Sequence, residues 1–306
     1  MNVRRIAVIG AGAVGAYYGG RLTQAGHVVD FFSRSDAGVL RSHGLRVRSV
    51  DGDFTIASPG VFDDVAGMPP ADVVIVALKA TARADYVRLV RPVLHDGSII
   101  VCLQNGLGNE EVFASAFGDN RVLGGIAYTC INRVGAGEIV HTAEGRVRVG
   151  PYGRAGLDAA ESVAGMMRDA NIQAEAVADL HFFRWQKLAW NIPFNGWGAA
   201  LDRHTAELLA TPGGGALIRD TMAEVLSAAR SVGVDLGGDA LIDDQIARTH
   251  RMGEYHSSMQ LDRQAGRAME IDAVVAEPLR QAKAAGCGPL PMIEVMLRCL
   301  QAVSDS

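Results

Sequence analysis

Short apolar runs alternate with amphipathic segments through the first half of the chain. The apolar runs predict strands at Arg5–Ile9, Val28–Phe32, Leu45–Val50, Val73–Ala77, Ser98–Leu103, Val122–Cys130, Ile139–Thr142 and Val147–Val149. Helices fit between several of them, at Ala16–Ala25, Asp36–His43, Ala80–Arg91 and Asn109–Phe117. Strands that alternate with helices predict an α/β fold with a doubly wound parallel sheet. The short runs and glycines from Gly124 to Gly150 predict antiparallel strands at the edge of that sheet.

The pattern changes near residue 178. Beyond it, strand signals almost vanish and long helical stretches dominate, at Asp179–Trp197, Gly215–Val232 and Ile271–Ala285. The run Pro212-Gly213-Gly214-Gly215 predicts a turn between helices. We therefore expect two domains, an α/β domain over residues 1–178 and an all-helical domain over residues 179–306.

A glycine motif follows the first strand. The residues are Gly10-Ala11-Gly12-Ala13-Val14-Gly15, between an apolar strand and a predicted helix. In this context G-x-G-x-x-G indicates a Rossmann-type dinucleotide site, because the glycines allow a tight turn, close approach of a pyrophosphate and close helix packing. The helix N-terminus then faces the phosphates. The alternative is a glycine-rich turn that binds no ligand.

The end of the second strand bears on which dinucleotide is bound. NAD sites usually carry an acid there that binds the ribose 2′-OH, but this chain has Ser33-Arg34-Ser35. Asp30 lies earlier, within the strand. A guanidinium suits a 2′-phosphate, so Arg34 favours NADPH over NADH. Arg34 as an ordinary solvated surface residue is the alternative.

The amino-acid composition argues against several classes of protein. The 306 residues are 49% hydrophobic and 21% charged, which is typical of a globular protein with two sizeable cores. A net charge of −5 without a basic run disfavours nucleic acid, and no apolar stretch reaches membrane-spanning length. Four cysteines without C-x-x-C spacing suggest no metal site and a cytoplasmic protein with reduced thiols, although a disulfide stays an alternative. Since the first strand begins at Arg5, we expect no signal peptide.

Two predicted strands end in polar residues. Lys79 follows one and Asn105 the next, in Gln104-Asn105-Gly106. Ligands of open α/β sheets bind beyond these strand ends, so Lys79 is placed to meet a phosphate or the substrate. Asn105 can both donate to and accept from a substrate or the nicotinamide ribose. The alternatives are a lysine at a strand end and an Asn-Gly turn.

Lys187, Asn191 and Asn195 are spaced by four residues in a stretch rich in Trp, Leu, Ile and Phe. They therefore share one face of a helix, which Pro193 should bend. This polar stripe indicates the wall of a cleft, or alternatively a face turned to water. Further on, Ser258 and Glu270 offer an alcohol and a carboxylate, but their spacing alone suggests only a helix cap followed by a charged surface.

Taken together, these segments resemble the ketopantoate reductases (2-dehydropantoate 2-reductases). The likeness runs through the glycine motif, Leu78-Lys79-Ala80, Gln104-Asn105-Gly106, the Lys187/Asn191/Asn195 helix, Ser257-Ser258-Met259 and Glu270-Ile271-Asp272, and so covers nearly the whole chain. The resemblance implies a Rossmann domain followed by a helical domain, with the active site in the cleft. It also implies reduction of ketopantoate to pantoate with NADPH, in the biosynthesis of pantothenate and coenzyme A.

Residue roles follow from the same resemblance. Lys187 would be the catalytic acid, with Glu270 completing the catalytic and cofactor site. Asn105, Asn191, Asn195 and Ser258 would bind or orient the substrate, with Asn105 also near the cofactor. Arg34 and Lys79 match the positions that bind the NADP phosphates. The partner would be a small 2-oxo acid, and the oligomeric state is open, a homodimer among the states considered.

Two departures from the family pattern bear on the pocket. Gly196-Trp197-Gly198 stands where smaller apolar or hydroxyl residues are common, and Ala273 to Pro278 lacks a usual glycine. Trp197 is the residue expected to reshape the pocket. Two alternatives therefore stay open, a reductase of a different small 2-oxo or hydroxy acid and an NADP(H)-binding redox sensor without turnover.

Overall fold

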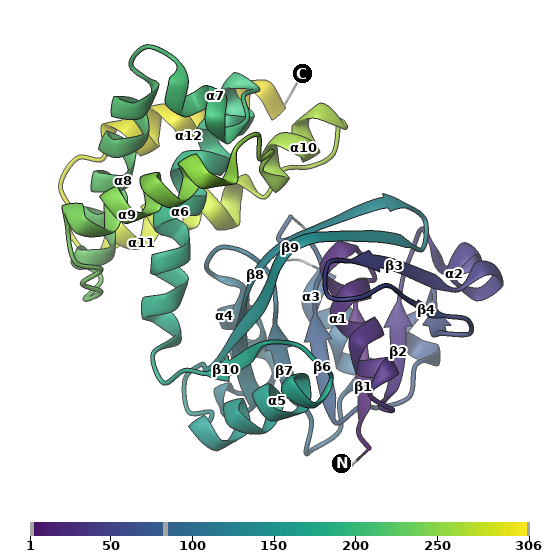
Figure 1. Cartoon of the computed structure of the whole chain (residues 1–306). Coiled ribbons are helices and arrows are strands. Elements are labelled where there is room, and N and C mark those ends of the chain that lie inside the picture. The colour runs from purple at the N-terminus through teal and green to yellow at the C-terminus, as the bar shows by residue number, and fades with distance from the viewer. Residues whose placement is uncertain (1–2, 82–84, 305–306) are drawn as a thin grey trace. The chain divides into compact units, whose positions relative to one another are not determined.

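The computed structural model describes residues 3–81 and 85–304. The chain forms two compact units. The first comprises residues 1–104 and 109–180, and the second comprises residues 105–108 and 181–306. A loop of the first half of the sequence, Asn105–Gly108, thus packs with the C-terminal helices. Figure 1 shows the elements of both units.

The first unit is built on a ten-stranded sheet. Its strands are β1 (Arg5–Ile9), β2 (Val28–Phe32), β3 (Leu45–Ser49), β4 (Phe54–Ile56), β5 (Gly60–Phe62), β6 (Val73–Val76), β7 (Ile99–Cys102), β8 (Val122–Gly135), β9 (Glu138–Pro151) and β10 (Ala174–Ala176). Its helices are α1 (Ala13–Gln24), α2 (Ala37–His43), α3 (Tyr86–Val90), α4 (Asn109–Phe117) and α5 (Leu157–Asp169). Residues 82–84 of the predicted helix Ala80–Arg91 lie outside the described residues.

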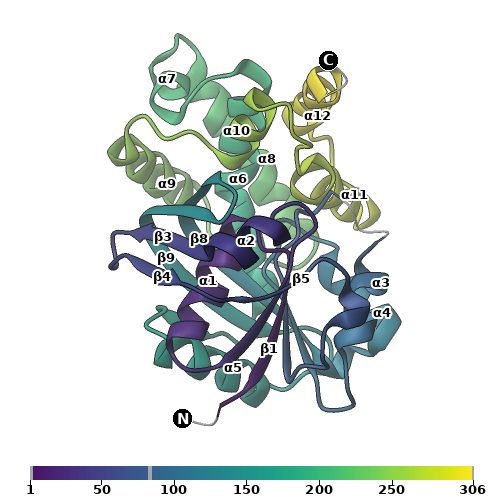
Figure 2. The ribbon, with the colours of Figure 1, turned by 90° about the vertical axis from the view of Figure 1, so that its right-hand side faces the viewer.

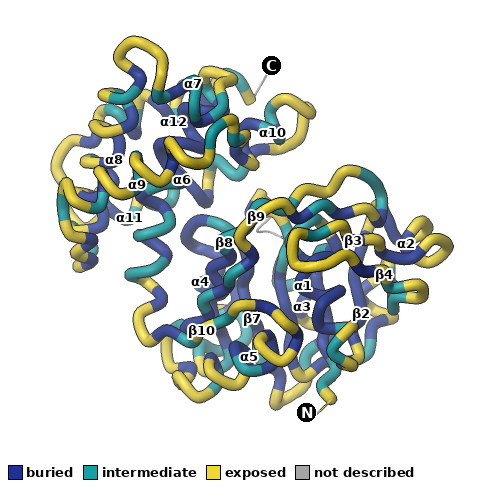
Figure 3. The backbone as a smooth tube through the Cα atoms, in the orientation of Figure 1, coloured by how far each residue is buried: buried dark blue, intermediate teal, exposed yellow. Residues whose placement is uncertain are grey.

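The central strands run in parallel in the order β8-β7-β6-β1-β2-β5, which is that of a Rossmann-type sheet. Side chains alternate between two cores: Ile6 and Val8 pack with α1, α2 and α5, whereas Ala7 and Ile9 pack with α3 and α4. Figure 2 shows α3 and α4 on one side of the sheet. The predicted doubly wound sheet is therefore confirmed, and burial on both faces explains its continuous apolar strands (Figure 3).

The antiparallel pair β8–β9 is present, but its predicted place at the sheet edge is wrong. β9 pairs with β8 on one side and with β3, in parallel, on the other, and β4 then pairs with β3. The two predicted strands Ile139–Thr142 and Val147–Val149 are parts of one strand, β9. Register shifts interrupt the pairing of β9 with β8. Pairing between segments so far apart in sequence leaves no local signal, so β3 was not predictable as the neighbour of β9.

Among its described residues, the second unit contains helices and connecting loops but no strand. Its helices are α6 (Leu180–Leu201), α7 (Thr205–Ala210), α8 (Gly214–Ser231), α9 (Asp239–Met252), α10 (Ser258–Gln264), α11 (Glu277–Ala284) and α12 (Pro291–Ser304), with a π-helical segment at Asp272–Ala276 before α11. Helix α6 continues through Pro193. Its residue Gly196 allows α12 to come close, because a Cβ there would meet the Met296 sulfur at 2.1 Å. The bend predicted at Pro193 stays a prediction.

Candidate active site

The glycine motif forms the turn between β1 and α1. Gly10 has φ +105°, and a Cβ there would lie 2.9 Å from the Leu78 backbone nitrogen, so the turn requires glycine. A Cβ on Gly15 would meet the carbonyl oxygen of Gly10 at 2.1 Å. Gly12 differs, because it is exposed and a Cβ there would meet no atom within 4 Å. Gly10 and Gly15 are thus needed by the fold, whereas the space over Gly12 is free for a ligand.

The N-terminus of α1 has the properties of an anion site. No side chain caps it, and its first turn holds no acidic residue. The first backbone N–H groups of a helix have no partner within the helix, and together with the helix dipole they favour a phosphate. Residues Ala11, Ala13 and Val14 lie at this turn. The turn therefore fits the pyrophosphate of a dinucleotide.

The end of β2 lies against the same turn, since the N–H groups of Gly10 and Ala11 both donate to the carbonyl oxygen of Phe32. Arg34 follows two residues later and is exposed, and no described residue forms an ion pair with it. Lys79, beyond the end of β6, is also exposed, while its carbonyl oxygen accepts a hydrogen bond from the Tyr86 hydroxyl at 3.1 Å. Both cations lie at the carboxyl ends of parallel strands, where ligands of such sheets bind.

Asn105 brings Lys187 and Glu270 together within the second unit. Its Oδ1 accepts a hydrogen bond from Lys187 Nζ at 2.8 Å, and its Nδ2 donates one to Glu270 Oε2 at 3.1 Å. The three residues come from the 105–108 loop, α6 and the segment before the π-helical turn. In this arrangement the carboxylate orients the amide, and the amide orients the ammonium. The ammonium can therefore act as a proton donor with a defined direction.

The loop that carries Asn105 is fixed by backbone contacts. Gly106 has φ +80°, and a Cβ there would lie 2.1 Å from the carbonyl oxygen of Ala273. The same oxygen accepts a hydrogen bond from the Leu107 N–H at 2.9 Å. Ala273 belongs to the π-helical segment, and such segments occur frequently at functional sites. This contact was not predicted from the sequence, where Asn-Gly indicated only an ordinary turn.

The environment of Lys187 favours its neutral form. Burial away from water, together with the nearby charge of Arg184, lowers the pKa of Lys187 from 10.5 to about 7, against the attraction of Glu270. Some of the side chain keeps accessible surface. A lysine with a pKa near 7 can hold and release a proton at neutral pH, which is the property required of a general acid.

Asn191 and Asn195 continue the face of α6 that carries Lys187. Both are buried, with 6% and 5% of their surface exposed, so the alternative in which this stripe faces water is wrong for them. Neither side-chain amide is among the fully buried polar atoms that lack a hydrogen-bond partner in the described residues, so both amides keep contact with solvent or with a partner. An accessible amide on the Lys187 face of α6 can both donate to and accept from a polar ligand.

The helix cap that the spacing around Ser258 suggests is present at the start of α10. Ser257 provides it, since its Oγ accepts from the Gln260 N–H, and Ser258 is the exposed first residue of the helix. Trp197 is buried in the helical core, and its indole N–H donates to the Thr221 hydroxyl at 2.9 Å. The role expected for Trp197 in reshaping the pocket is therefore not supported by its contacts.

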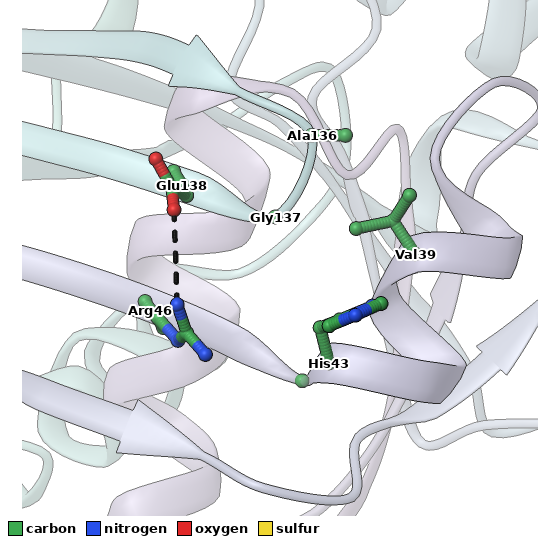
Figure 4. A pocket seen from close by; sticks show the side chains of 7 residues that line it. Val39, His43, Arg46, Ala136, Gly137 and Glu138 are labelled. Atoms are coloured by element: carbon green, nitrogen blue, oxygen red, sulfur yellow. Dashed lines mark ion pairs between the residues drawn. The ribbon is translucent and has the colours of Figure 1, made fainter.

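A cavity of about 200 Å³ lies elsewhere in the first unit, between the end of α2 and the β8–β9 turn (Figure 4). An ion pair between Arg46 and Glu138, with 3.9 Å between nitrogen and oxygen, crosses its wall. None of the predicted site residues lines it. Among the described residues no cluster of three metal-ligating acids, histidines or cysteines occurs, and none of the four cysteines, all of them described, forms a disulfide. Within the same residues, every helix is too short or too polar to span a membrane.

A Rossmann-type sheet joined to a helical unit that holds a lysine, an amide and a carboxylate is the architecture of a dinucleotide-dependent oxidoreductase. The sequence model of the family "Ketopantoate reductase PanE/ApbA" matches residues 6–154, and that of its C-terminal domain matches residues 179–304. The chain belongs to the ketopantoate reductase family, and it is an oxidoreductase.

Individual relatives agree with this assignment. A 2-dehydropantoate 2-reductase of Nostoc sp. is 37% identical, with 98% of this chain and 95% of the relative covered. The crystal structure of 2-dehydropantoate 2-reductase from Geobacter metallireducens has a TM-score of 0.94 and 38% identity, and 97% and 99% of the two chains are covered. A D-mandelate dehydrogenase complex with NADH and anilino(oxo)acetate has a TM-score of 0.90 over 98% of both chains at 21% identity, so it shares the fold.

Proposed function

We propose that this protein reduces ketopantoate to pantoate with NADPH, in the biosynthesis of pantothenate and coenzyme A. The observation that carries the proposal is the Lys187–Asn105–Glu270 arrangement, in a chain of the ketopantoate reductase family. NADPH, when bound, supplies the hydride for the ketone carbon. The residues of this chain supply the proton, the hydrogen bonds to the substrate and the charges that hold the cofactor.

Lys187 donates the proton to the developing alkoxide of the substrate. Its ammonium is directed by Asn105, whose own orientation is fixed because its Nδ2 donates to Glu270. The same asparagine and carboxylate are proposed to contact the cofactor. The positive charge of Lys187 is stabilised less by water than usual, so it stabilises the developing negative oxygen more strongly. Proton donation of this kind contributes roughly 10²–10⁴ in rate.

Asn191 and Asn195 are proposed to bind the substrate. Their buried amides offer donors for the carboxylate and an acceptor for the hydroxyl of ketopantoate. Ser258 is the third proposed contact, and its exposure at the start of α10 leaves its hydroxyl accessible.

NADPH is proposed to bind over residues 10–15, with Arg34 on the 2′-phosphate and Lys79 on a phosphate. The open space over Gly12 and the uncapped N-terminus of α1 support the pyrophosphate position. The exposed guanidinium of Arg34 near the end of β2 supports the choice of NADPH. A cytoplasmic location and a homodimer stay predictions.

The experiment that tests this function follows NADPH and NADH oxidation with ketopantoate and with a panel of other 2-oxo acids. We expect the highest kcat/KM for ketopantoate with NADPH. A higher value with another acid would transfer the proposal to that substrate. NADPH binding without turnover of any acid would instead support the redox sensor.

A further inference from the structure

Arg133 of β8 and Asp36, which precedes α2 shortly after the end of β2, form an ion pair that joins two segments far apart in sequence. Nε and Nη2 of Arg133 donate to Oδ2 and Oδ1 of Asp36, both at 2.6 Å. This is the side-on, two-bond geometry in which a guanidinium binds a carboxylate most strongly. Asp36 is buried, with 4% of its surface exposed, whereas Arg133 is partly exposed.

The carboxylate of Asp36 accepts hydrogen bonds from two side chains. Besides the two bonds from Arg133, Oδ1 accepts from the Ser35 hydroxyl at 2.8 Å. Burial would raise the pKa of Asp36, but the hydrogen bonds from Arg133 and Ser35 and the charge of Arg133 hold it below its usual value. Asp36 is therefore charged at neutral pH, and its charge is compensated by Arg133.

This pairing matters because Asp36 is two residues from Arg34. An acid near the end of this strand normally binds the ribose 2′-OH and repels a 2′-phosphate. The other acid of this stretch, Asp30, is likewise paired, with Arg5 at 2.7 Å. Both acids between residues 30 and 36 are thus held by arginines from other segments, and neither neutralises Arg34.

We infer that Arg133 is a specificity-determining residue for the cofactor, which compensates Asp36 so that the positive charge of Arg34 is available to the 2′-phosphate of NADPH. The inference rests on the proposed use of NADPH. Arg133 acts through Asp36 and needs no contact with the cofactor, so it is a positioning residue. The effect of Arg133 on cofactor binding should depend on its charge, and it should change the affinity for NADPH but not that for NADH.

The test compares four versions of the full chain, the wild type, Arg133→Leu, Asp36→Asn and the double variant. Relative to the wild type, Arg133→Leu removes one positive charge, Asp36→Asn removes one negative charge, and the double variant leaves the sum unchanged. Affinities for NADPH and NADH are measured by fluorescence titration at low ionic strength, where charges are least screened. Thermal unfolding of each protein is recorded, and Arg133→Gln replaces Arg133→Leu if that variant does not fold.

We expect the preference for NADPH over NADH to be greatest in Asp36→Asn, similar in the wild type and the double variant, and least in Arg133→Leu. In Arg133→Leu the Kd for NADPH should rise by up to about tenfold, because the uncompensated charge of Asp36 then weakens the attraction of Arg34 for the 2′-phosphate, with little change for NADH. A higher salt concentration should reduce the difference in NADPH affinity between Arg133→Leu and the wild type.

Two outcomes would overturn the inference alone, and a third would overturn the proposed cofactor as well. Equal weakening of both cofactors in Arg133→Leu, without recovery in the double variant, would mean that Arg133 only holds the local structure. An unchanged preference in Arg133→Leu would mean that Arg133 has no part in cofactor choice. A wild type that binds NADH as tightly as NADPH would instead contradict the cofactor in the proposed function, and the inference with it.

Discussion

Asn105 and Lys187 are joined by a hydrogen bond of 2.8 Å, although they lie 82 positions apart in the chain. The bond is formed because the 105–108 loop packs with the helical unit and not with the sheet whose strand it follows. The absence of a side chain at Gly106 lets this loop approach the carbonyl oxygen of Ala273. The position of the proposed proton donor therefore depends on a turn from the other half of the sequence.

Replacing Asn105 should change both the rate and its pH dependence. Asn105→Ala removes the acceptor that directs the Lys187 ammonium, so we expect kcat to fall by roughly tenfold or more. Asn105→Asp places a carboxylate beside Lys187 and should raise the pKa of the lysine, which moves the midpoint of the kcat–pH curve upward. A midpoint that stays in place in Asn105→Asp would show that Lys187 does not control the profile.

The low pKa of Lys187 predicts the direction of the pH dependence. The donor must be protonated, and its pKa of about 7 means that the protonated fraction falls as the pH rises above that value. We expect kcat for ketopantoate reduction to be highest below pH 7 and to fall by about tenfold per pH unit well above it. The measurement is kcat at saturating NADPH and substrate between pH 5 and pH 10, and a constant kcat up to pH 9 would contradict the assignment.

Gly12 and Gly15 provide a matched pair of substitutions. Ser suits the N-cap position of Gly12 and meets no protein atom there, so Gly12→Ser should leave the melting temperature nearly unchanged and weaken NADPH binding. Gly15→Ala should instead lower the melting temperature, because its Cβ would meet the oxygen of Gly10. Thermal unfolding and NADPH titration separate the two effects. Tight NADPH binding by Gly12→Ser would exclude the space over Gly12 as the phosphate site.

Asn191→Ala and Asn195→Ala test the substrate face of α6. Since no hydrogen bond joins either side-chain amide to another described residue, its removal should cost little stability. Each change should raise KM for ketopantoate or lower kcat/KM by about tenfold, as for the loss of a hydrogen bond to a charged group, while the Kd for NADPH is retained. Unfolding of either variant would instead mean that the asparagine has a structural role.

The sequence allowed the prediction of those features that depend on local pattern. The glycine turn follows from residue type and position, and the shared face of Lys187, Asn191 and Asn195 follows from the helical period of 3.6 residues. The features that it did not predict are pairings between distant segments. The placement of β3 beside β9, the docking of Gly106 on Ala273 and the Arg133–Asp36 ion pair have no local signal. Trp197 shows the same limit, because only the packing of α8 reveals its bond to Thr221.

The proton donor is the central claim, and the kcat of Lys187→Ala with ketopantoate and NADPH tests it most directly. Lys283→Ala is the matched control, because that lysine forms an exposed ion pair with Glu294 on the surface of the helical unit. We predict a fall in kcat of roughly 100-fold or more for Lys187→Ala, an unchanged Kd for NADPH, and normal kinetics for the control. A kcat for Lys187→Ala close to that of the wild type would contradict the account.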